Sequence, residues 1–83
     1  MESKQKELIA IGASVSANCH PCVKFHVDKA IKMKIASEDI STALEVGIMV
    51  RGGAAGQMDK LLSAVTTDNG IDYKGSAPQQ GCK

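Results

Sequence analysis

The chain has 83 residues and a mass of 8.7 kDa, with ten basic and nine acidic side chains and a formal net charge of +1. Hydrophobic residues make up 43% and charged residues 23%, a composition that indicates a globular protein and excludes a disordered one. Aromatic residues are only 2% and no basic stripe is present, which argues against a nucleic-acid-binding domain. We expect one small domain that gains stability from a metal, a disulfide or oligomerisation.

The cysteine count and the N-terminal sequence indicate the cellular compartment in which we expect the protein. Residues 1–7 are polar and of mixed charge, and no apolar stretch approaches the roughly 20 residues that span a bilayer. We therefore expect a cytoplasmic protein. Its three cysteines are an odd number, and Cys19 and Cys22 are three positions apart. In the cytosol this spacing indicates redox chemistry or metal binding, not a framework of structural disulfides.

The first half of the chain predicts two amphipathic helices, over residues 3–17 and 20–34. In the first, apolar positions recur at helical spacing, with Glu7 on the same side: Leu8, Ile11, Gly12 and Val15. In the second, one apolar stripe faces a side rich in lysine: Val23, Val27, Ala30 and Ile31. Both segments should bury one face.

The second half predicts two further helices separated by a break. Ser37 followed by two acids is expected to cap a helix over residues 38–50, and the apolar sequence from Ala43 onward should be buried on most sides. The glycines after Arg51 predict a break, followed by an amphipathic helix over residues 54–67 and a turn at 68–70. No segment alternates like a strand. We expect an all-α fold, with a helical core at 1–67 and a flexible C-terminal tail at 68–83.

The segment from Asn18 to His26 carries the chemistry. Pro21 suits the first turn of a helix, which places Cys19 near the N-cap and Cys22 one turn inside. Cys22 and His26 are four apart, so they share a helix face. The positive end of the helix dipole and the neighbouring histidine both favour thiolate over thiol. Two thiols at this spacing can also close into a disulfide, so the pair can cycle.

Competing uses of these residues stay open at this point. A metal could take Cys19, Cys22 and His26, with Cys82 or His20 as a fourth ligand, but structural zinc sites usually show two ligand pairs far apart. We therefore expect no metal. His20 is a supporting candidate that could be exposed and tune the thiols only indirectly.

Glu7 lies twelve positions before Cys19 on the first predicted helix. If the first two helices pack antiparallel, Glu7 and His26 could meet, and the carboxylate could orient the imidazole and accept its proton. The alternative is a solvated charge at the start of the chain. Spacing alone leaves both interpretations open.

These intervals carry a resemblance to a known family. Glu7, twelve positions to Cys19, three to Cys22 and four to His26 resemble the signature of the alkylhydroperoxidase D branch of the carboxymuconolactone decarboxylase family. The flanking sequence is similar as well, at 8–12, 27–30, 37–40 and 49–55. The resemblance covers roughly residues 5–66, and the tail lies outside it.

The resemblance implies a fold, an assembly and an activity. The fold is a small all-α bundle completed by homo-oligomerisation, as a trimer or hexamer, with no cofactor other than a redox-active disulfide. The activity is that of a thiol peroxidase or disulfide reductase. It further implies that Cys22 attacks a hydroperoxide, that Cys19 closes the disulfide, and that Glu7 and His26 relay the proton. A dithiol reductant, such as a lipoyl or thioredoxin-like protein, then reopens the bond.

The chain departs from this pattern at two places. The relay histidine that the family carries directly before the second cysteine is Pro21 here, and His20 stands one position earlier. Cys82 in the tail could be an extra resolving thiol or an ordinary free cysteine. We expect Cys22 to meet small peroxides and Cys19 to exchange with other disulfides.

Three other classes are weighed against this reading. The decarboxylase branch of the same family acts on a lactone and does not depend on a cysteine pair. A thioredoxin-like oxidoreductase would have a strand before its cysteine pair, where this chain reads as helix. A metal-binding or assembly module would show no thiol turnover. Arg51, the only arginine, is expected to be a surface or helix-terminal charge, with binding of a substrate carboxylate as the alternative.

Overall fold

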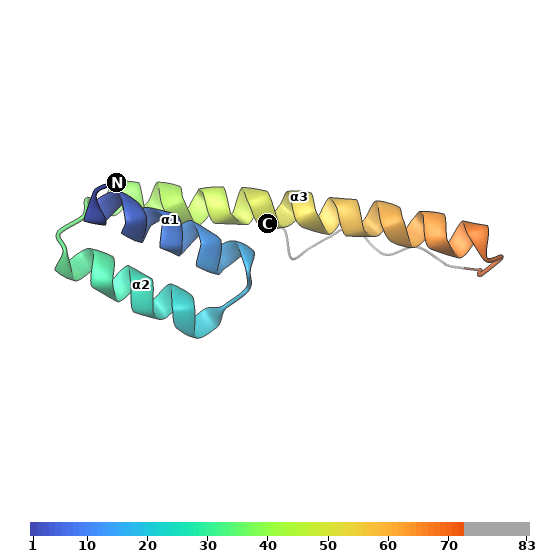
Figure 1. Cartoon of the computed structure of the whole chain (residues 1–83), viewed down its shortest axis with the longest axis horizontal. Helices are drawn as coiled ribbons and strands as arrows, with labels where there is room; N and C mark the ends of the chain where they lie inside the picture. The colour runs from blue at the N-terminus through green and yellow to red at the C-terminus, as the bar shows by residue number, and fades with distance from the viewer. Residues whose placement is uncertain (73–83) are drawn as a thin grey trace.

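A computed structural model describes residues 1–72 and shows three helices, with no strand among those residues (Figure 1). They are α1 (Ser3–Ser16), α2 (His20–Lys32) and α3 (Ser37–Asp68). Helices α1 and α2 form an antiparallel hairpin beside the N-terminal half of α3, and the rest of α3 extends beyond them (Figure 1). The all-α prediction is confirmed. Residues 73–83, which include Cys82, lie outside the described residues, and the division into core and tail stays a prediction.

All three helices end in the same local motif. A residue in the left-handed region follows each helix, namely Asn18 (φ 57°), Lys34 (φ 63°) and Gly70 (φ 67°). Two backbone N–H groups then bond back to carbonyls of the last turn, the Schellman arrangement. These bonds run from Asn18 to Val15 and Cys19 to Ser14, from Lys34 to Ile31 and Ile35 to Ala30, and from Gly70 to Thr67 and Ile71 to Thr66. The helix ends are therefore fixed by local backbone hydrogen bonds.

The core is small and lies where the hairpin meets α3. Ile11 and Ala30 are fully buried, and Ile35 and Ile40 join them in one apolar cluster. Partly buried side chains pack around this cluster: Leu8, Val27, Met33, Ala43 and Leu44. Helix α1 contacts both α2 and α3, so it is the central element of the described fold.

Glycine permits the close approach of α1 and α3. A Cβ atom added at Gly47 would lie 2.6 Å from the carbonyl oxygen of Gly12 and 2.6 Å from the Cβ atom of Val15. A Cβ atom at Gly12 would lie 3.3 Å from the carbonyl oxygen of Ala43. The two helix backbones therefore touch, and a side chain at Gly47 would force them apart.

The predicted break after Arg51 is wrong, because α3 runs unbroken through it. A glycine costs a helix about 1 kcal/mol relative to alanine, but it keeps its backbone N–H group and does not clash with the preceding turn. Proline lacks the N–H group, and its ring clashes with the preceding turn. Residues 37–68 contain no proline, so good helix formers on both sides carry the helix through the glycines. The cap is also displaced by one residue, since the N-cap is Ala36 and Ser37 begins the helix.

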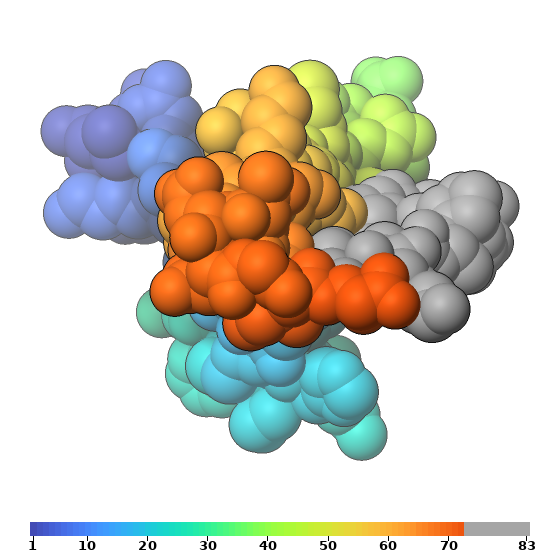
Figure 2. Space-filling view, turned by 90° about the vertical axis from the view of Figure 1, so that its right-hand side faces the viewer, coloured from blue at the N-terminus to red at the C-terminus, as the bar shows by residue number. Residues whose placement is uncertain are grey.

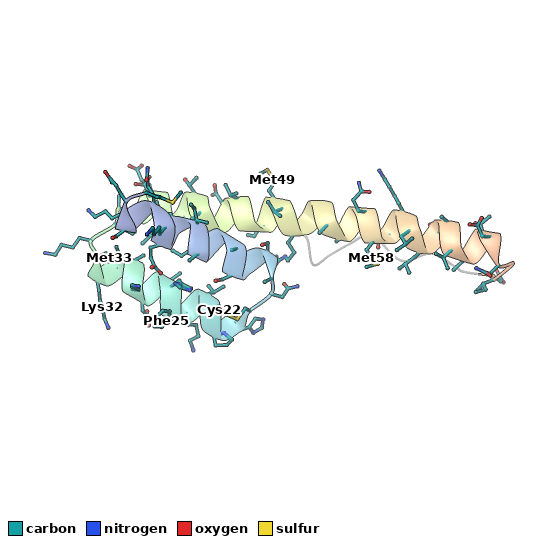
Figure 3. The ribbon with its side chains drawn as sticks, in the orientation of Figure 1. Cys22, Phe25, Lys32, Met33, Met49 and Met58 are labelled. Carbon is teal, nitrogen blue, oxygen red and sulfur yellow. A yellow bond between two sulfur atoms is a disulfide. The ribbon has the colours of Figure 1, made fainter. Side chains whose placement is uncertain are left out.

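The burial expected for the apolar part of α3 is wrong for the single chain. Val46, Met49 and Val50 are 45%, 67% and 52% exposed, and Ile31, assigned to the buried stripe of α2, is 60% exposed. Met49 points away from α1 and α2 (Figure 3). The physical reason is that the other two helices cannot surround α3, which packs mainly against α1 and so is covered mostly on one side.

The described fold is elongated, and apolar side chains line the extended half of α3. Its radius of gyration is 16.8 Å, against about 12 Å for a compact domain of this length. Figure 2, which looks at the C-terminal end of α3, shows α1 and α2 lying behind it. Large exposed side chains follow one another there at helical spacing: Met58, Leu61, Leu62 and Val65. No helix in the described part of the chain is both long and apolar enough to cross a membrane.

Candidate redox site

The cysteine pair sits at the joint between α1 and α2. Cys19 is the N-cap of α2, and its carbonyl accepts the N–H of Val23 at 3.0 Å. Pro21 occupies the first turn, as its fixed φ predicts. Cys19 and Cys22 form a disulfide with their Cα atoms 5.2 Å apart, within the range that disulfides span. In the reduced protein both thiols would face the positive end of α2, which favours their thiolate forms.

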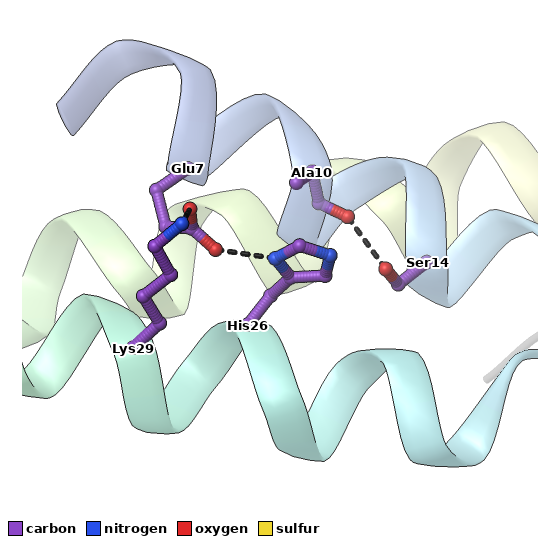
Figure 4. A network of polar contacts seen from close by, with 5 residues as sticks. All are labelled: Glu7, Ala10, Ser14, His26 and Lys29. Atoms are coloured by element: carbon purple, nitrogen blue, oxygen red, sulfur yellow. Dashed lines mark hydrogen bonds and ion pairs between the residues drawn. The ribbon is translucent and has the colours of Figure 1, made fainter. Parts of the chain in front are cut away.

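Glu7 and His26 are in direct contact across the hairpin (Figure 4). Oε2 of Glu7 meets Nδ1 of His26, and Oε1 lies 3.5 Å from Nζ of Lys29. Glu7 is only 5% exposed, so it is not a solvated surface charge. A buried carboxylate is costly unless it is paired, and here both of its oxygens face groups on α2. The antiparallel packing considered from the sequence brings these residues together.

This contact sets the hydrogen-bonding state of His26. When the Glu7 carboxylate is ionised it can only accept, and Nδ1 of His26 then carries the proton that it donates to Glu7. In the neutral ring the lone pair then belongs to Nε2, which becomes the nitrogen able to take a proton. His26 follows Cys22 by one helical turn. The arrangement can therefore supply a proton acceptor and donor beside the second cysteine.

A small pocket opens beside the first cysteine. Its volume is about 120 Å³, and residues from all three helices or their junctions line it: Ser14, Val15, Asn18, Cys19, His20, Val23 and Arg51. Cys22 is not among them. His20, the supporting candidate, is exposed at the rim of this pocket, away from the pairing of Glu7 with His26.

Arg51 differs from its expected place at a helix end. It lies in mid-α3, partly buried, and its Nη1 donates to Oδ1 of Asn18 at 3.1 Å. Because the break after Arg51 is absent, the residue is not at a helix terminus. Sequence reasoning could not find its link to Asn18, which joins residues 33 positions apart.

Ser14 was missed altogether by the sequence analysis. The residue is buried, at 7% exposure, and its hydroxyl donates to the carbonyl of Ala10 at 2.6 Å. The available signal was spacing, since Ser14 follows Glu7 by seven positions and so lies two turns along the same face. It lines the pocket beside Cys19 and also accepts the Cys19 N–H through its carbonyl.

Metal ligation was the main competing use of these side chains. Within residues 1–72, no group of three or more His, Cys, Asp or Glu side chains is placed to hold a metal ion. Cys82, the possible extra thiol or ligand, lies outside the described residues.

Known sequences are similar to this chain over most of its length. The sequence profile of the carboxymuconolactone decarboxylase family matches residues 1–67. An uncharacterized protein of Cupriavidus necator is 35% identical over 48 residues, which are 58% of this chain and 42% of that protein. The match thus spans less than half the length of this relative. No solved structure matches the chain.

Proposed function

We propose, because the chain belongs to the carboxymuconolactone decarboxylase family, that it is an oxidoreductase of the alkylhydroperoxidase D-like branch that cycles Cys19 and Cys22 between dithiol and disulfide. The observation that carries the proposal is the contact of buried Glu7 with His26, one turn beyond Cys22. A lactone enzyme could use such a pair as a general acid and base, but neither it nor an assembly module would need two closely spaced cysteines beside the pair.

The oxidative half begins at Cys22. Its thiolate attacks the terminal oxygen of a hydroperoxide, so that a sulfur–oxygen bond forms, the oxygen–oxygen bond breaks, and the alcohol leaves. His26 takes the thiol proton on Nε2 and returns it to the departing alkoxide, while Glu7 holds the ring. The product on Cys22 is a sulfenic acid. The thiolate of Cys19 then attacks this sulfur, the disulfide closes, and the hydroxyl leaves as water.

The reductive half needs a dithiol. We propose a lipoyl or thioredoxin-like protein as its source, which would hand two electrons to the disulfide by thiol exchange. We place this cycle in the cytoplasm, where a reducing thiol supply is maintained. No cofactor other than the disulfide itself takes part.

Simple disulfide reduction is the second candidate activity. The pocket beside the pair opens at Cys19 and not at Cys22, which favours exchange with an external thiol. Pro21 also stands where the peroxidase branch of the family has a further relay histidine. In this version the same pair exchanges with thiols and disulfides but turns over no peroxide.

We also propose that the protein works as a homo-oligomer, a trimer or hexamer. An apolar groove of about 390 Å³ lies between α1 and α3, lined by Leu8, Ile9, Gly12, Asp39, Thr42, Ala43 and Val46. Exposed apolar side chains continue along the extended half of α3. Contiguous apolar surface of this kind marks interaction sites on soluble proteins.

The test is consumption of tert-butyl hydroperoxide with dihydrolipoamide as reductant. We expect turnover by the native chain, loss of turnover in Cys22→Ser and Cys19→Ser, and a disulfide between these two residues by mass spectrometry. Cys82→Ser is the matched control and should keep its turnover. Thiol exchange without peroxide turnover would leave the reductase. Absence of both activities would refute the redox proposal.

A further inference from the structure

We infer that Lys29 is a positioning residue for the proposed reaction: it holds the second oxygen of Glu7, and through that carboxylate it keeps the proton of His26 on Nδ1. The inference rests on the proposed function and adds one residue to the same proton relay. Lys29 acts on the relay from behind, because its contact is with Glu7 and not with the cysteine pair.

The first argument is that both oxygens of the Glu7 carboxylate have partners on α2. Oε2 meets Nδ1 of His26, and Oε1 lies 3.5 Å from Nζ of Lys29 (Figure 4). His26 and Lys29 are three positions apart in α2, so they are neighbours on its surface. Contacts to both oxygens fix the direction in which the carboxylate faces the imidazole.

The second argument is charge. Glu7 is buried, and an ionised carboxylate that is removed from water is costly unless it is paired. A neutral imidazole donates a hydrogen bond to the carboxylate but carries no formal charge. The ammonium group of Lys29 therefore supplies a positive charge beside Glu7 while His26 is neutral and ready to take a proton. The Lys29 side chain is 53% exposed, so it can do this while it remains in contact with solvent.

The consequence for the relay is a fixed tautomer. Which nitrogen of a neutral imidazole carries the proton is set by the hydrogen bonds of the ring. With Glu7 held by Lys29, the proton stays on Nδ1 and the lone pair on Nε2, the nitrogen proposed to take the Cys22 proton. Without Lys29 the carboxylate would turn toward water, and part of the His26 population would carry its proton on Nε2. That part cannot accept the Cys22 proton there.

The first readout is the tautomer itself, measured by nitrogen-15 NMR of the reduced full-length protein labelled at histidine, at a pH where His26 is neutral. The signals that disappear in His26→Gln belong to His26, which separates them from those of His20. We expect a protonated Nδ1 and a bare Nε2 in the native protein. Lys29→Met should move both shifts toward the average of the two tautomers, and Lys29→Arg, which keeps the charge, should stay close to the native values.

The second readout is single-turnover oxidation of Cys22 by tert-butyl hydroperoxide. Lys29→Met should slow this step about two- to fivefold, the range expected of a partly exposed ion pair, and Lys29→Arg should recover most of the native rate. Reduction of the disulfide by dihydrolipoamide should keep its native rate in both variants, as expected of folded proteins. Lys32→Met removes an exposed charge from the same helix and is the matched control, with the native tautomer and the native rate.

The outcomes separate this inference from the proposed function. A native tautomer in Lys29→Met would overturn the inference whatever the oxidation rate, and so would an unchanged rate despite a changed tautomer. Equal slowing of both half-reactions would also overturn it, because that result indicates a general structural role. If the native protein itself does not react with the hydroperoxide, the proposed peroxidase function fails, while the NMR measurement still tests the hold of Lys29 on His26.

Discussion

Adding one methyl group at Gly47 tests the close packing of α1 against α3. The new Cβ would lie 2.6 Å from the carbonyl oxygen of Gly12, a backbone atom that cannot turn aside. Overpacking of this kind costs roughly 3 kcal/mol, and the better helix propensity of alanine returns about 1 kcal/mol. We therefore expect Gly47→Ala to lower the free energy of unfolding by about 2 kcal/mol, which lowers the Tm by about 8–16 °C.

The assay is thermal unfolding followed by circular dichroism, with all variants at one protomer concentration because assembly also shifts the Tm. Gly53→Ala is the matched control on the same helix, since a Cβ there meets nothing within 4 Å. It should stabilise the protein by about 0.5–1 kcal/mol. A Gly47→Ala variant that unfolds at or above the native temperature would refute the packing argument.

The remaining predictions concern a turn, the proton relay and the surface of α3. Lys34 holds φ at 63°, so Lys34→Gly should raise the denaturant midpoint by an amount worth about 1 kcal/mol. His26→Gln should slow single-turnover oxidation of Cys22 by about 10²- to 10⁴-fold, and Glu7→Gln should slow it less. Leu61→Lys, which places a charge on the exposed apolar face of α3, should reduce the mass measured by light scattering.

Each of these has a control and an opposing outcome. Lys32, the last residue of α2, has helical backbone angles, so Lys32→Gly should destabilise, and a gain there would contradict the argument from the left-handed turn. The two relay variants should still be reduced by dithiols at the native rate, and a loss of both half-reactions would indicate a folding defect. Ser63→Lys, exposed on the same helix, should leave the mass unchanged. An unchanged mass for Leu61→Lys would show that this face is not an interface.

Local signals in the sequence predicted the parts of the fold that depend on local physics. The starts of α1 and α2 follow from amphipathic spacing and from Pro21, and the turn near Gly70 follows from its residue types. Cys19 stands at the N-cap for the same reason. The break after Arg51 failed because glycine weakens a helix without interrupting its hydrogen bonds.

Contacts between residues far apart in the sequence were harder to predict. The approach of Glu7 to His26 could be considered because a short turn between helices implies antiparallel packing, but its burial could not be decided from spacing. The hydrogen bond from Arg51 to Asn18 forms only because α3 passes beside the turn between α1 and α2, and no local sequence pattern predicts that placement. The exposure of Met49 and Val50 shows the same limit, because an apolar sequence does not say whether the chain's own helices will cover it.

Cys19 takes part in both the end of α1 and the start of α2, which explains why the spacing between Glu7, Cys19 and His26 cannot vary. Its N–H completes the stop of α1 by bonding to Ser14, and its carbonyl opens α2 by accepting from Val23. The hairpin therefore has no spare residue between the two helices. An insertion at this joint would separate the stop from the start and shift the register of α2 against α1. The twelve positions from Glu7 to Cys19 thus set the register of α1 against α2, and a change in that length would move Glu7 out of line with His26.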